Sequence, residues 1–402
     1  MKMDATTAPR GPTRHHQPRR RHGRTATALA LSGLLDLASL TRTRAEDRVD
    51  YRYEDYAEEG GRIHIRTHGL YFDAALKSWL SLKGNYIHDA ISGATPTGAP
   101  PLPGQTTVPK ATIDDIRNAG YLEPTFRIRN HSVSPQIAYS TESDYESLGI
   151  ALNDAIDLNE KNTTLAIGLS HAFDRVLPNA GASITEDQDK DSTDGLIGVT
   201  QLLGPQTLLT ANLTLGYADG YLSDPYKRVL FDDFPYNPGQ PYTVWPENRP
   251  GHKFRQVAYL SLQHYFEKVQ GAAELSYRFH HDDWGVLAHT VSVQWNQKIG
   301  KILLVSPLFR FYTQTEADFY GTHFPGDPSD PLVPLPSYYS ADYRLSALNS
   351  FTYGVSLAGR IHEHVSLAFS YKRYDMDGTD GVTAADQYPK ANVFTGGLTI
   401  WF

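Results

Sequence analysis

The sequence predicts an all-β protein: a transmembrane antiparallel up-and-down β-barrel of about sixteen strands, with short periplasmic turns and long extracellular loops. Three observations lead to this prediction. Apolar and polar residues alternate over segments of roughly ten residues, the length that a tilted membrane strand needs. Short connections between these segments alternate with long ones. The chain ends on such a segment, and its last residue is the aromatic Phe402.

Composition narrows the alternatives. The chain has 402 residues, no cysteine and 25 tyrosines, and its mean hydropathy is −0.43. No stretch of about 18 consecutive apolar residues occurs, which excludes a helical membrane protein. A β-barrel is compatible with this composition, because only alternate residues of its strands need to be apolar. The absence of cysteine excludes disulfides, thiol nucleophiles and Cys-ligated metal sites.

Residues 1–45 have the pattern of a signal peptide that is removed from the mature chain. A basic head between Arg10 and Arg24 precedes a mostly apolar run from Ala26 to Leu40, and Ala45 is the small residue at the expected cut. A disordered basic tail is the alternative. These residues hold nine of the 37 Lys and Arg and two of the 45 Asp and Glu, so residues 46–402 carry a net charge of −15. An acidic chain disfavours nucleic acid as a partner, since phosphate binding needs clustered Lys and Arg.

Alternation continues along the whole expected mature chain. It is cleanest from Leu209 to Tyr217, where Leu, Ala and Tyr share one face and Thr, Asn and Gly the other. Similar segments lie at residues 49–54, 63–68, 80–86, 165–170, 273–280, 291–295 and 365–372. The strands of a soluble sandwich also alternate, but they average about five or six residues.

The connections also follow an alternating pattern. Short links are expected near residues 75–79, 130–131, 158–161, 204–205, 267–269, 299–300 and 361–364. Longer stretches rich in Gly, Pro and Asp are expected near 93–120, 174–193, 220–253, 317–341 and 376–390. Short turns at one end and long loops at the other are typical of bacterial outer-membrane barrels, whereas a Greek-key sandwich gives no reason for them.

Parity fixes the strand count. Both termini should lie on the periplasmic side, so the number of strands is even. This requires a first strand at about 48–58, turned by Glu58 to Gly61, and one long strand, without a hairpin, from about 342 to 360. The first and last strands should then pair and close the barrel. The residues expected side by side on the lipid face are Val49, Tyr51 and Tyr53 from the first strand and Phe394, Leu398 and Ile400 from the last.

The C-terminal strand also resembles the assembly signal of outer-membrane barrels. In that class the barrel-assembly machinery reads a terminal aromatic residue with alternating apolar residues before it. The corresponding residues here are Phe402, Ile400, Leu398 and Phe394.

Asp154 interrupts an otherwise apolar face formed by Leu148, Ile150, Leu152 and Ile156. A carboxylate facing the middle of the membrane costs up to a few kcal/mol. Either a bulge turns Asp154 inward, or this end of the strand lies in the headgroup zone.

Five stretches carry a resemblance to a known family. They are residues 50–56, 89–98, 220–227, 277–285 and 341–346. Together they resemble the bacterial family catalogued as domain of unknown function 3570, across nearly the whole expected mature chain. The resemblance implies an outer-membrane barrel and brings no catalytic residues. Genes of the family often lie near those for a flavin-attaching transferase, a thioredoxin-like protein and a small lipoprotein, so it also implies periplasmic redox partners.

Charged residues expected to line the lumen are the candidates for permeation. They are Arg66, Lys83, Arg127, Glu274, Arg278, Arg310, Arg344 and Lys372. His64 and His68, which flank Arg66 on the same strand face, are expected to line the lumen as well. Rings of charge set the selectivity of a pore. The same charges can instead pair and stiffen a barrel that conducts nothing, and both interpretations stay open.

Two segments resemble metal sites, and we expect neither to bind a metal. Residues 187–191 have the carboxylate spacing of a calcium loop, but Ser192 and Gly198 stand where that loop needs Gly and Glu. His280 and His281 are neighbours on a strand and therefore point to opposite faces. We expect no metal and no cofactor.

The sequence leads to three hypotheses of function. The first is a bacterial outer-membrane channel or export pore for a small polar or anionic solute, because basic residues are expected inside an otherwise acidic chain. The second is a structural or docking barrel for flavin- or thioredoxin-associated partners, without conductance. The least favoured is a surface hydrolase, and we expect no enzyme, with no catalytic residue assigned. The other expected partners are outer-membrane lipid, lipopolysaccharide and the barrel-assembly machinery.

Overall fold

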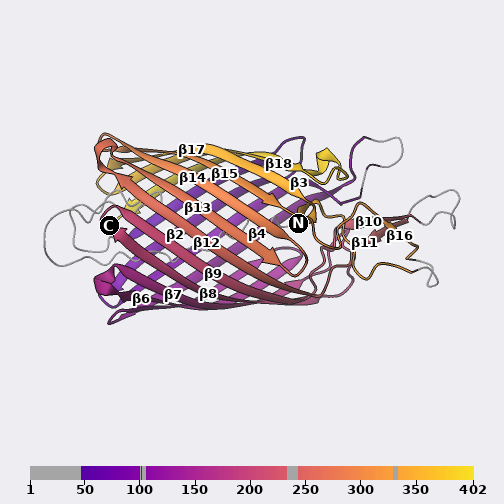
Figure 1. Ribbon diagram of the computed structural model, residues 1–402, viewed down its shortest axis with the longest axis horizontal. Helices are drawn as coiled ribbons and strands as arrows, with labels where there is room; N and C mark the ends of the chain where they lie inside the picture. Colours follow the sequence, from indigo (N-terminus) through magenta and orange to yellow (C-terminus); the bar gives the residue numbers. More distant parts are fainter. Residues whose placement is uncertain (1–46, 100, 102–105, 233–242, 329–333) are drawn as a thin grey trace.

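The computed structural model describes residues 47–99, 101, 106–232, 243–328 and 334–402, so the expected signal peptide lies outside the described residues. A closed antiparallel barrel of sixteen strands forms the body of the molecule (Figure 1), which confirms the predicted fold class. Its strands are β1 Arg48–Glu58, β2 His64–Lys77, β3 Leu80–Pro96, β4 Lys110–Ile128, β5 His131–Thr141, β6 Tyr145–Leu158, β7 Thr163–Val176, β8 Gln188–Gly204, β9 Thr207–Gly220, β12 His252–Phe266, β13 Gly271–Asp282, β14 Leu287–Ile299, β15 Leu303–Gln314, β17 Leu348–His362, β18 Val365–Gly378 and β19 Lys390–Trp401.

The first and last strands close the barrel as predicted. Val49 pairs with Ile400 and Tyr51 with Leu398, while Tyr53 lies opposite Gly396. The turn after β1 contains Gly60 and Gly61 with φ of 70° and 65°, a left-handed conformation that favours glycine. The strand expected at about 342–360 is single, as predicted, but it begins only at Leu348.

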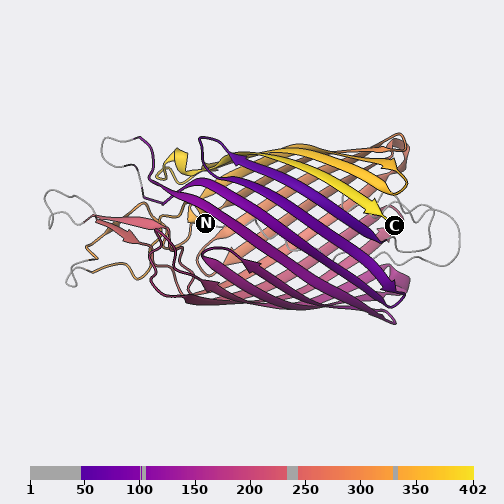
Figure 2. The ribbon, with the colours of Figure 1, turned by 180° about the vertical axis from the view of Figure 1, so that it is seen from behind.

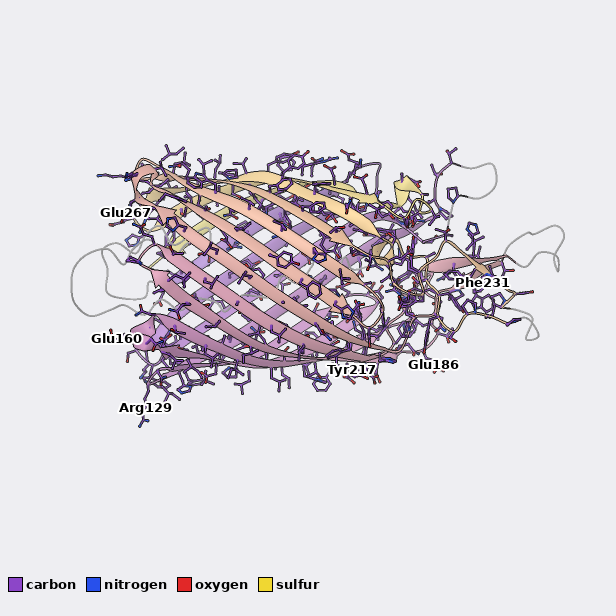
Figure 3. All side chains as sticks on the ribbon, in the orientation of Figure 1. Arg129, Glu160, Glu186, Tyr217, Phe231 and Glu267 are labelled. Carbon is purple, nitrogen blue, oxygen red and sulfur yellow. The ribbon has the colours of Figure 1, made fainter. Side chains whose placement is uncertain are left out.

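The two ends of the barrel differ. At one end, here called the turn end, every connection between neighbouring strands is short. Figure 3 labels Arg129, Glu160 and Glu267 there, and the C-terminus lies at the same end (Figure 2). At the opposite end, here called the loop end, the long connections are 97–109, 177–187, 221–251, 315–347 and 379–389. Three loop-end connections, 59–63, 142–144 and 283–286, are short, so the predicted asymmetry holds with these exceptions.

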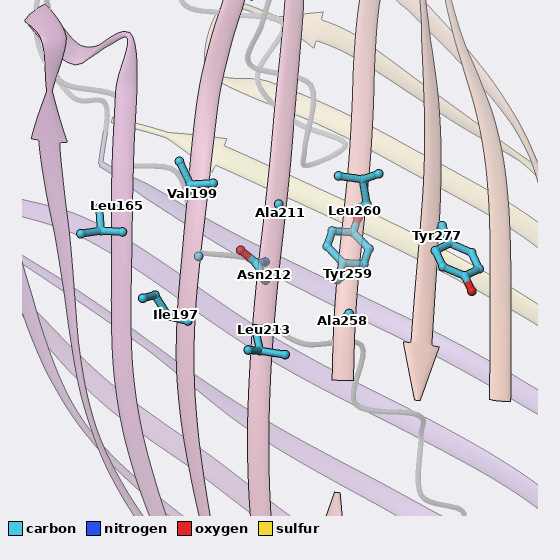
Figure 4. A pocket seen from close by; sticks show the side chains of 11 residues that line it. Leu165, Ile197, Val199, Ala211, Asn212, Leu213, Ala258, Tyr259, Leu260 and Tyr277 are labelled. Carbon is cyan, nitrogen blue, oxygen red and sulfur yellow. The ribbon is translucent and has the colours of Figure 1, made fainter. Parts of the chain in front are cut away.

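The outer and inner faces of the wall differ in polarity. Directly paired residues share a face, so the strand register defines the outer face around the whole barrel. Exposed apolar residues such as Leu70, Tyr86, Ile150 and Phe369 occupy the outer face. Over β8, β9 and β12 that face has a shallow apolar depression of about 500 Å³, where the small Ala211 and Ala258 lie among larger neighbours (Figure 4).

Asp154 lies on the outer face. It pairs directly with Val133 and Ile167, and neither ladder has a register shift, so the alternative that a bulge turns it inward is wrong. The Nδ1 atom of His131 lies 2.7 Å from the Oδ2 atom of Asp154.

Among the described residues, no helix is long and apolar enough to span a membrane.

A second, smaller sheet lies beyond the loop end (Figure 1). It contains β10 Arg228–Asp232, β11 Thr243–Pro246 and β16 His323–Pro325, with β10 in the middle. Val229, Phe231, Phe324, Tyr339 and Ala341 form its buried core. The sheet therefore joins the β9–β12 connection to the β15–β17 connection.

Candidate functional site

Six of the eight predicted lumen residues point into the barrel. Lys83, Arg127, Glu274, Arg278, Arg310 and Lys372 all have the inward parity of their strands. Lys83 Nζ lies 3.9 Å from Asp73 Oδ2, and Arg127 donates a hydrogen bond from Nη2 to Ser81 Oγ at 3.1 Å. Ser261 Oγ lies 3.4 Å from Glu274 Oε1, to which it donates.

The prediction for Arg66 is wrong. Arg66 pairs with Asp55 and Ala90 on the outer face, where its side chain is 60% exposed. His64 and His68 share that face, so their expected place in the lumen is also wrong. The cause is the environment of the inner face near the loop end. There Arg62 lies over the ring of Tyr343 of the cap, and Ile65 has the inward parity of β2, so an apolar residue of this strand faces inward.

Arg344 is also misplaced by the sequence prediction. It does not lie on a strand of the wall but in the short helix η3 (Tyr343–Leu345), within the β15–β17 connection. Its guanidinium belongs to a cluster of charges at the barrel mouth.

Three inward bases form a band on one side of the lumen, here called the basic band. They are Arg278 on β13, Arg310 on β15 and Lys372 on β18, and each is seven residues beyond its strand's first residue at the turn end. The inward residues paired with them are Tyr259, Thr290, Ser292, Thr352, Gly354 and Val393. No carboxylate is paired with the basic band.

Among the described residues, the members of the basic band have no acidic partners. Within the described part of the chain, none of its three residues forms an ion pair; Arg310 Nε donates to Ser292 Oγ at 3.0 Å, and the enclosed Nε of Arg278 has no hydrogen-bond partner. Several other bases on the wall meet acids, as for Arg255 with Asp194 at 2.6 Å, whereas inward Arg127 donates to Ser81. Further pairs are Lys253 with Asp282, Arg117 with Asp89 and Lys190 with Asp174. Uncompensated positive charge therefore gathers at the basic band.

A cap closes over the loop end. It consists of the described parts of the β9–β12 and β15–β17 connections, and it touches the wall at widely separated strands. Lys227 Nζ donates to the carbonyl oxygen of Pro96 at 2.6 Å, and Tyr226 donates to Asp144 Oδ2 at 2.7 Å. On another side, Tyr343 of the cap forms a buried cluster with Leu348 and Tyr388, and inward Tyr312 of β15 and Met376 of β18 pack against this cluster. The cap therefore spans the mouth directly above the basic band.

Six charged residues, here called the cap network, join the two connections. Asp224, Lys227, Glu247 and Arg249 come from the first connection, and Asp342 and Arg344 from the second. Arg344 Nη2 donates to Asp224 Oδ2 at 2.8 Å, Arg249 Nη2 donates to Asp342 Oδ2 at 2.7 Å, and Arg344 also pairs with Asp342. The side chains of Lys227 and Asp342 have no exposed surface. Three acids and three bases make the cap network neutral, which permits its burial.

The electrostatics of the cap network favour the ionised form of Asp342. Burial alone raises the pKa of a carboxyl group, but Arg344, Lys227 and Arg249 outweigh it and hold the pKa of Asp342 well below 3.8. Glu247 behaves in the opposite way, because burial and the neighbouring Asp342 and Asp224 raise its pKa above 4.5 despite Arg249.

Three carboxylates approach one another beside the mouth. Oxygen atoms of Asp115, Glu142 and Asp144 lie within 4.8 Å of one another. Asp115 Oδ1 accepts hydrogen bonds from two backbone N–H groups, and Glu142 lies 3.5 Å from Arg117 Nε, so these oxygens already have partners. In the two segments that resemble metal sites, Asp189 and Asp191 face outward and Lys190 inward, and His280 and His281 lie on opposite faces.

The family model described as "Protein of unknown function (DUF3570)" matches residues 24–395. The chain belongs to this family. Two of the stretches that suggested it, 220–227 and 341–346, supply four members of the cap network, Asp224, Lys227, Asp342 and Arg344. Glu247 and Arg249 lie outside those stretches, and nothing in the sequence pattern marks them.

Solved outer-membrane barrels resemble the chain in fold. CdiB from Acinetobacter baumannii is 7% identical with a TM-score of 0.52, over 90% of this chain and 61% of that chain. The siderophore receptor PirA from Pseudomonas aeruginosa is 10% identical with a TM-score of 0.42, over 89% and 62%. OmpT of Vibrio cholerae is 8% identical with a TM-score of 0.45, over 90% and 99%. The chain spans less than two thirds of the CdiB and PirA chains, and a search of curated proteins found no match.

Proposed function

We propose that this protein is a gated channel or export pore of the bacterial outer membrane that passes a small polar or anionic solute. The observation that carries the proposal is the basic band, which places uncompensated positive charge inside a large closed barrel. In this proposal the turn end faces the periplasm and the loop end the cell exterior, the orientation in which short turns and long loops occur in bacterial barrels.

The anion preference follows from elementary electrostatics. Neighbouring strands lie about 4.8 Å apart, so Arg278 and Arg310 on alternate strands are roughly 10 Å apart along the wall. A solute that moves along this side of the lumen passes both guanidiniums and the Lys372 ammonium, none of which has a paired carboxylate, and rings of one sign set pore selectivity. The positive potential of the basic band concentrates anions in the lumen and repels cations.

The cap supplies the gate in this proposal. A barrel of sixteen strands is wide enough to leave an aqueous lumen, but the cap spans its loop-end mouth. Passage therefore requires the cap network to separate or the cap to move as a unit.

Recordings in planar lipid bilayers test the proposal. We expect stepwise conductance that is low for the wild-type barrel and higher for Asp342→Asn, with a reversal potential in a KCl gradient that shows chloride preference. A folded barrel that conducts in neither form, or that prefers potassium in both, overturns the proposal.

The second candidate is a docking barrel for periplasmic redox proteins, flavinylated or thioredoxin-like, without conductance. The observation that favours it is the buried cap network, which is suited to holding the mouth shut permanently. Co-purification of such a partner with a barrel that stays silent in both forms supports this candidate. Conductance together with the absence of any such partner contradicts it.

A further inference from the structure

We propose that the basic band is a binding site for a tetrahedral oxyanion, either a phosphate ion or the phosphoryl group of a small solute. This inference deepens the proposed function and names its substrate class. It rests on the inward placement of the basic band, and its test does not need conductance.

The first step concerns charge. Arg278, Arg310 and Lys372 carry three positive charges, and the strand ladders pair them with uncharged residues only. A multiply charged anion can neutralise more of this charge than chloride can. The wall bases that pair with acids, such as Arg255, Lys253, Arg117 and Lys190, are already neutralised.

The second step concerns geometry. Arg278 reaches β14 at Thr290, and Arg310 reaches it from the other side at Ser292, so two guanidiniums flank a strip of hydroxyl groups. Guanidinium groups donate two parallel hydrogen bonds and match the oxygens of phosphate, while hydroxyls can donate to the remaining oxygens. A planar monoanion uses fewer of these donors.

The third step concerns an unsatisfied donor. The Nε of Arg278 is enclosed, yet no atom of the described residues accepts its hydrogen bond. Leaving such a donor without a partner is unfavourable, whereas Arg310 satisfies its own Nε at Ser292. Arg278 therefore lacks a full set of partners within the described part of the protein.

The fourth step links the basic band to the cap. Tyr312 follows Arg310 by one inward position on β15 and packs against the buried cluster that contains Tyr343 of the cap. Gln314, the next inward residue, donates to the backbone carbonyl oxygens of Arg344 and Ser346 at 3.0 and 2.8 Å. The site therefore lies directly below the cap, so a bound anion is on the lumen side of the proposed gate.

Isothermal titration of inorganic phosphate into the full chain, folded in detergent micelles at low ionic strength, tests the inference. We expect saturable binding that falls more than tenfold in Arg278→Gln and in Arg310→Gln. The matched control is Lys298→Gln, an inward base on β14 of the same wall near the turn end, which should bind as the wild type does. Heat-modifiable mobility in gels verifies that each variant is folded.

The site is contradicted if folded wild type binds no phosphate and no glycerol 3-phosphate. It is also contradicted by an equal loss in Lys298→Gln, which indicates only a diffuse lumen potential. Sulfate should compete with phosphate at least tenfold better than acetate, and equal competition also contradicts it. Binding of inorganic phosphate alone assigns the site to the free ion, and binding of glycerol 3-phosphate alone assigns it to phosphorylated solutes. A silent barrel that binds phosphate refutes the channel but keeps the site.

Discussion

Asp342 is the most enclosed acid of the cap network, in contact with Lys227, Arg249 and Arg344. The substitution Asp342→Asn leaves three bases with two carboxylates. Removing one partner from a buried charge network costs about 3–5 kcal/mol, so we expect the cap to open more readily by about that free energy. Limited proteolysis of the loop-end connections measures the effect as faster cleavage. The control is Glu316→Gln, an exposed acid of the same connection; equal cleavage rates in the two variants contradict the prediction.

The pH dependence of the cap has a defined sign. The pKa of Asp342 is depressed below 3.8, so its contribution to stability is present above that pH and is lost as the pH falls below it. The pKa of Glu247 is raised above 4.5, so its contribution is present in acid and declines as the pH rises. We therefore expect a cap that resists protease at pH 5 at least as well as at pH 8, and that fails only below pH 3.8. Opening between pH 7 and pH 5 contradicts this assignment.

The inward direction of Arg278 is predictable from its neighbours, because Leu275, Tyr277 and Phe279 define the outer face of the same strand. The direction of Arg66 is not predictable in this way. Alternation identifies the two faces of a strand, and the more polar face is then assumed to point into the lumen. Near the loop end this assumption fails, because the inner face packs against the cap instead of water.

Strands β13, β15 and β18 each contribute one member of the basic band, so we expect the three residues to act together on ion selectivity. We expect the triple variant Arg278→Gln, Arg310→Gln and Lys372→Gln to lower the chloride-to-potassium permeability ratio by roughly tenfold. Reversal potentials in a KCl gradient measure this ratio, with Lys298→Gln as the control. If the permeability ratio is unchanged in the triple variant, residues other than the basic band set the selectivity.

The seam between β1 and β19 provides a test of barrel closure. Val49 and Ile400 are direct partners, and paired Cα atoms of antiparallel strands lie about 4.5–5.5 Å apart, within disulfide range. The wild-type chain has no cysteine, so Val49→Cys combined with Ile400→Cys should cross-link on oxidation and yield a circularly closed species in non-reducing gels. Val49→Cys combined with Phe394→Cys should not cross-link, and equal yields from both pairs would argue against this register.

Strands and turns follow from local signals, whereas the cap does not. Alternation and parity predict the barrel, its closure and the turn at Gly60–Gly61. The cap network depends on contacts between residues far apart in sequence, such as Arg344 with Asp224 at a separation of 120 positions. No periodicity connects such residues, so Arg344 is assigned to a strand and Glu247 and Arg249 are missed.

The whole molecule has a direction that labelling of intact cells can determine. Glu186 is exposed at the loop end and Glu267 at the turn end (Figure 3). With the proposed orientation, a membrane-impermeant maleimide should label Glu186→Cys on intact cells, and should label Glu267→Cys only after the outer membrane is permeabilised. The reverse pattern inverts the proposed topology, and labelling of neither variant in either condition argues against exposure at these ends.

The cap network also has a consequence for biogenesis. Its two contributing connections are separated along the chain by β12, β13, β14 and β15, so the ionic contacts between them cannot form until those strands have taken their places. In a partly inserted barrel the ion pair between Lys227 and Asp342 would be absent, and the loop-end segments would stay accessible to proteases. Formation of the cap network thus requires β12 to β15 to be in place, and a barrel that stalls before β15 lacks it.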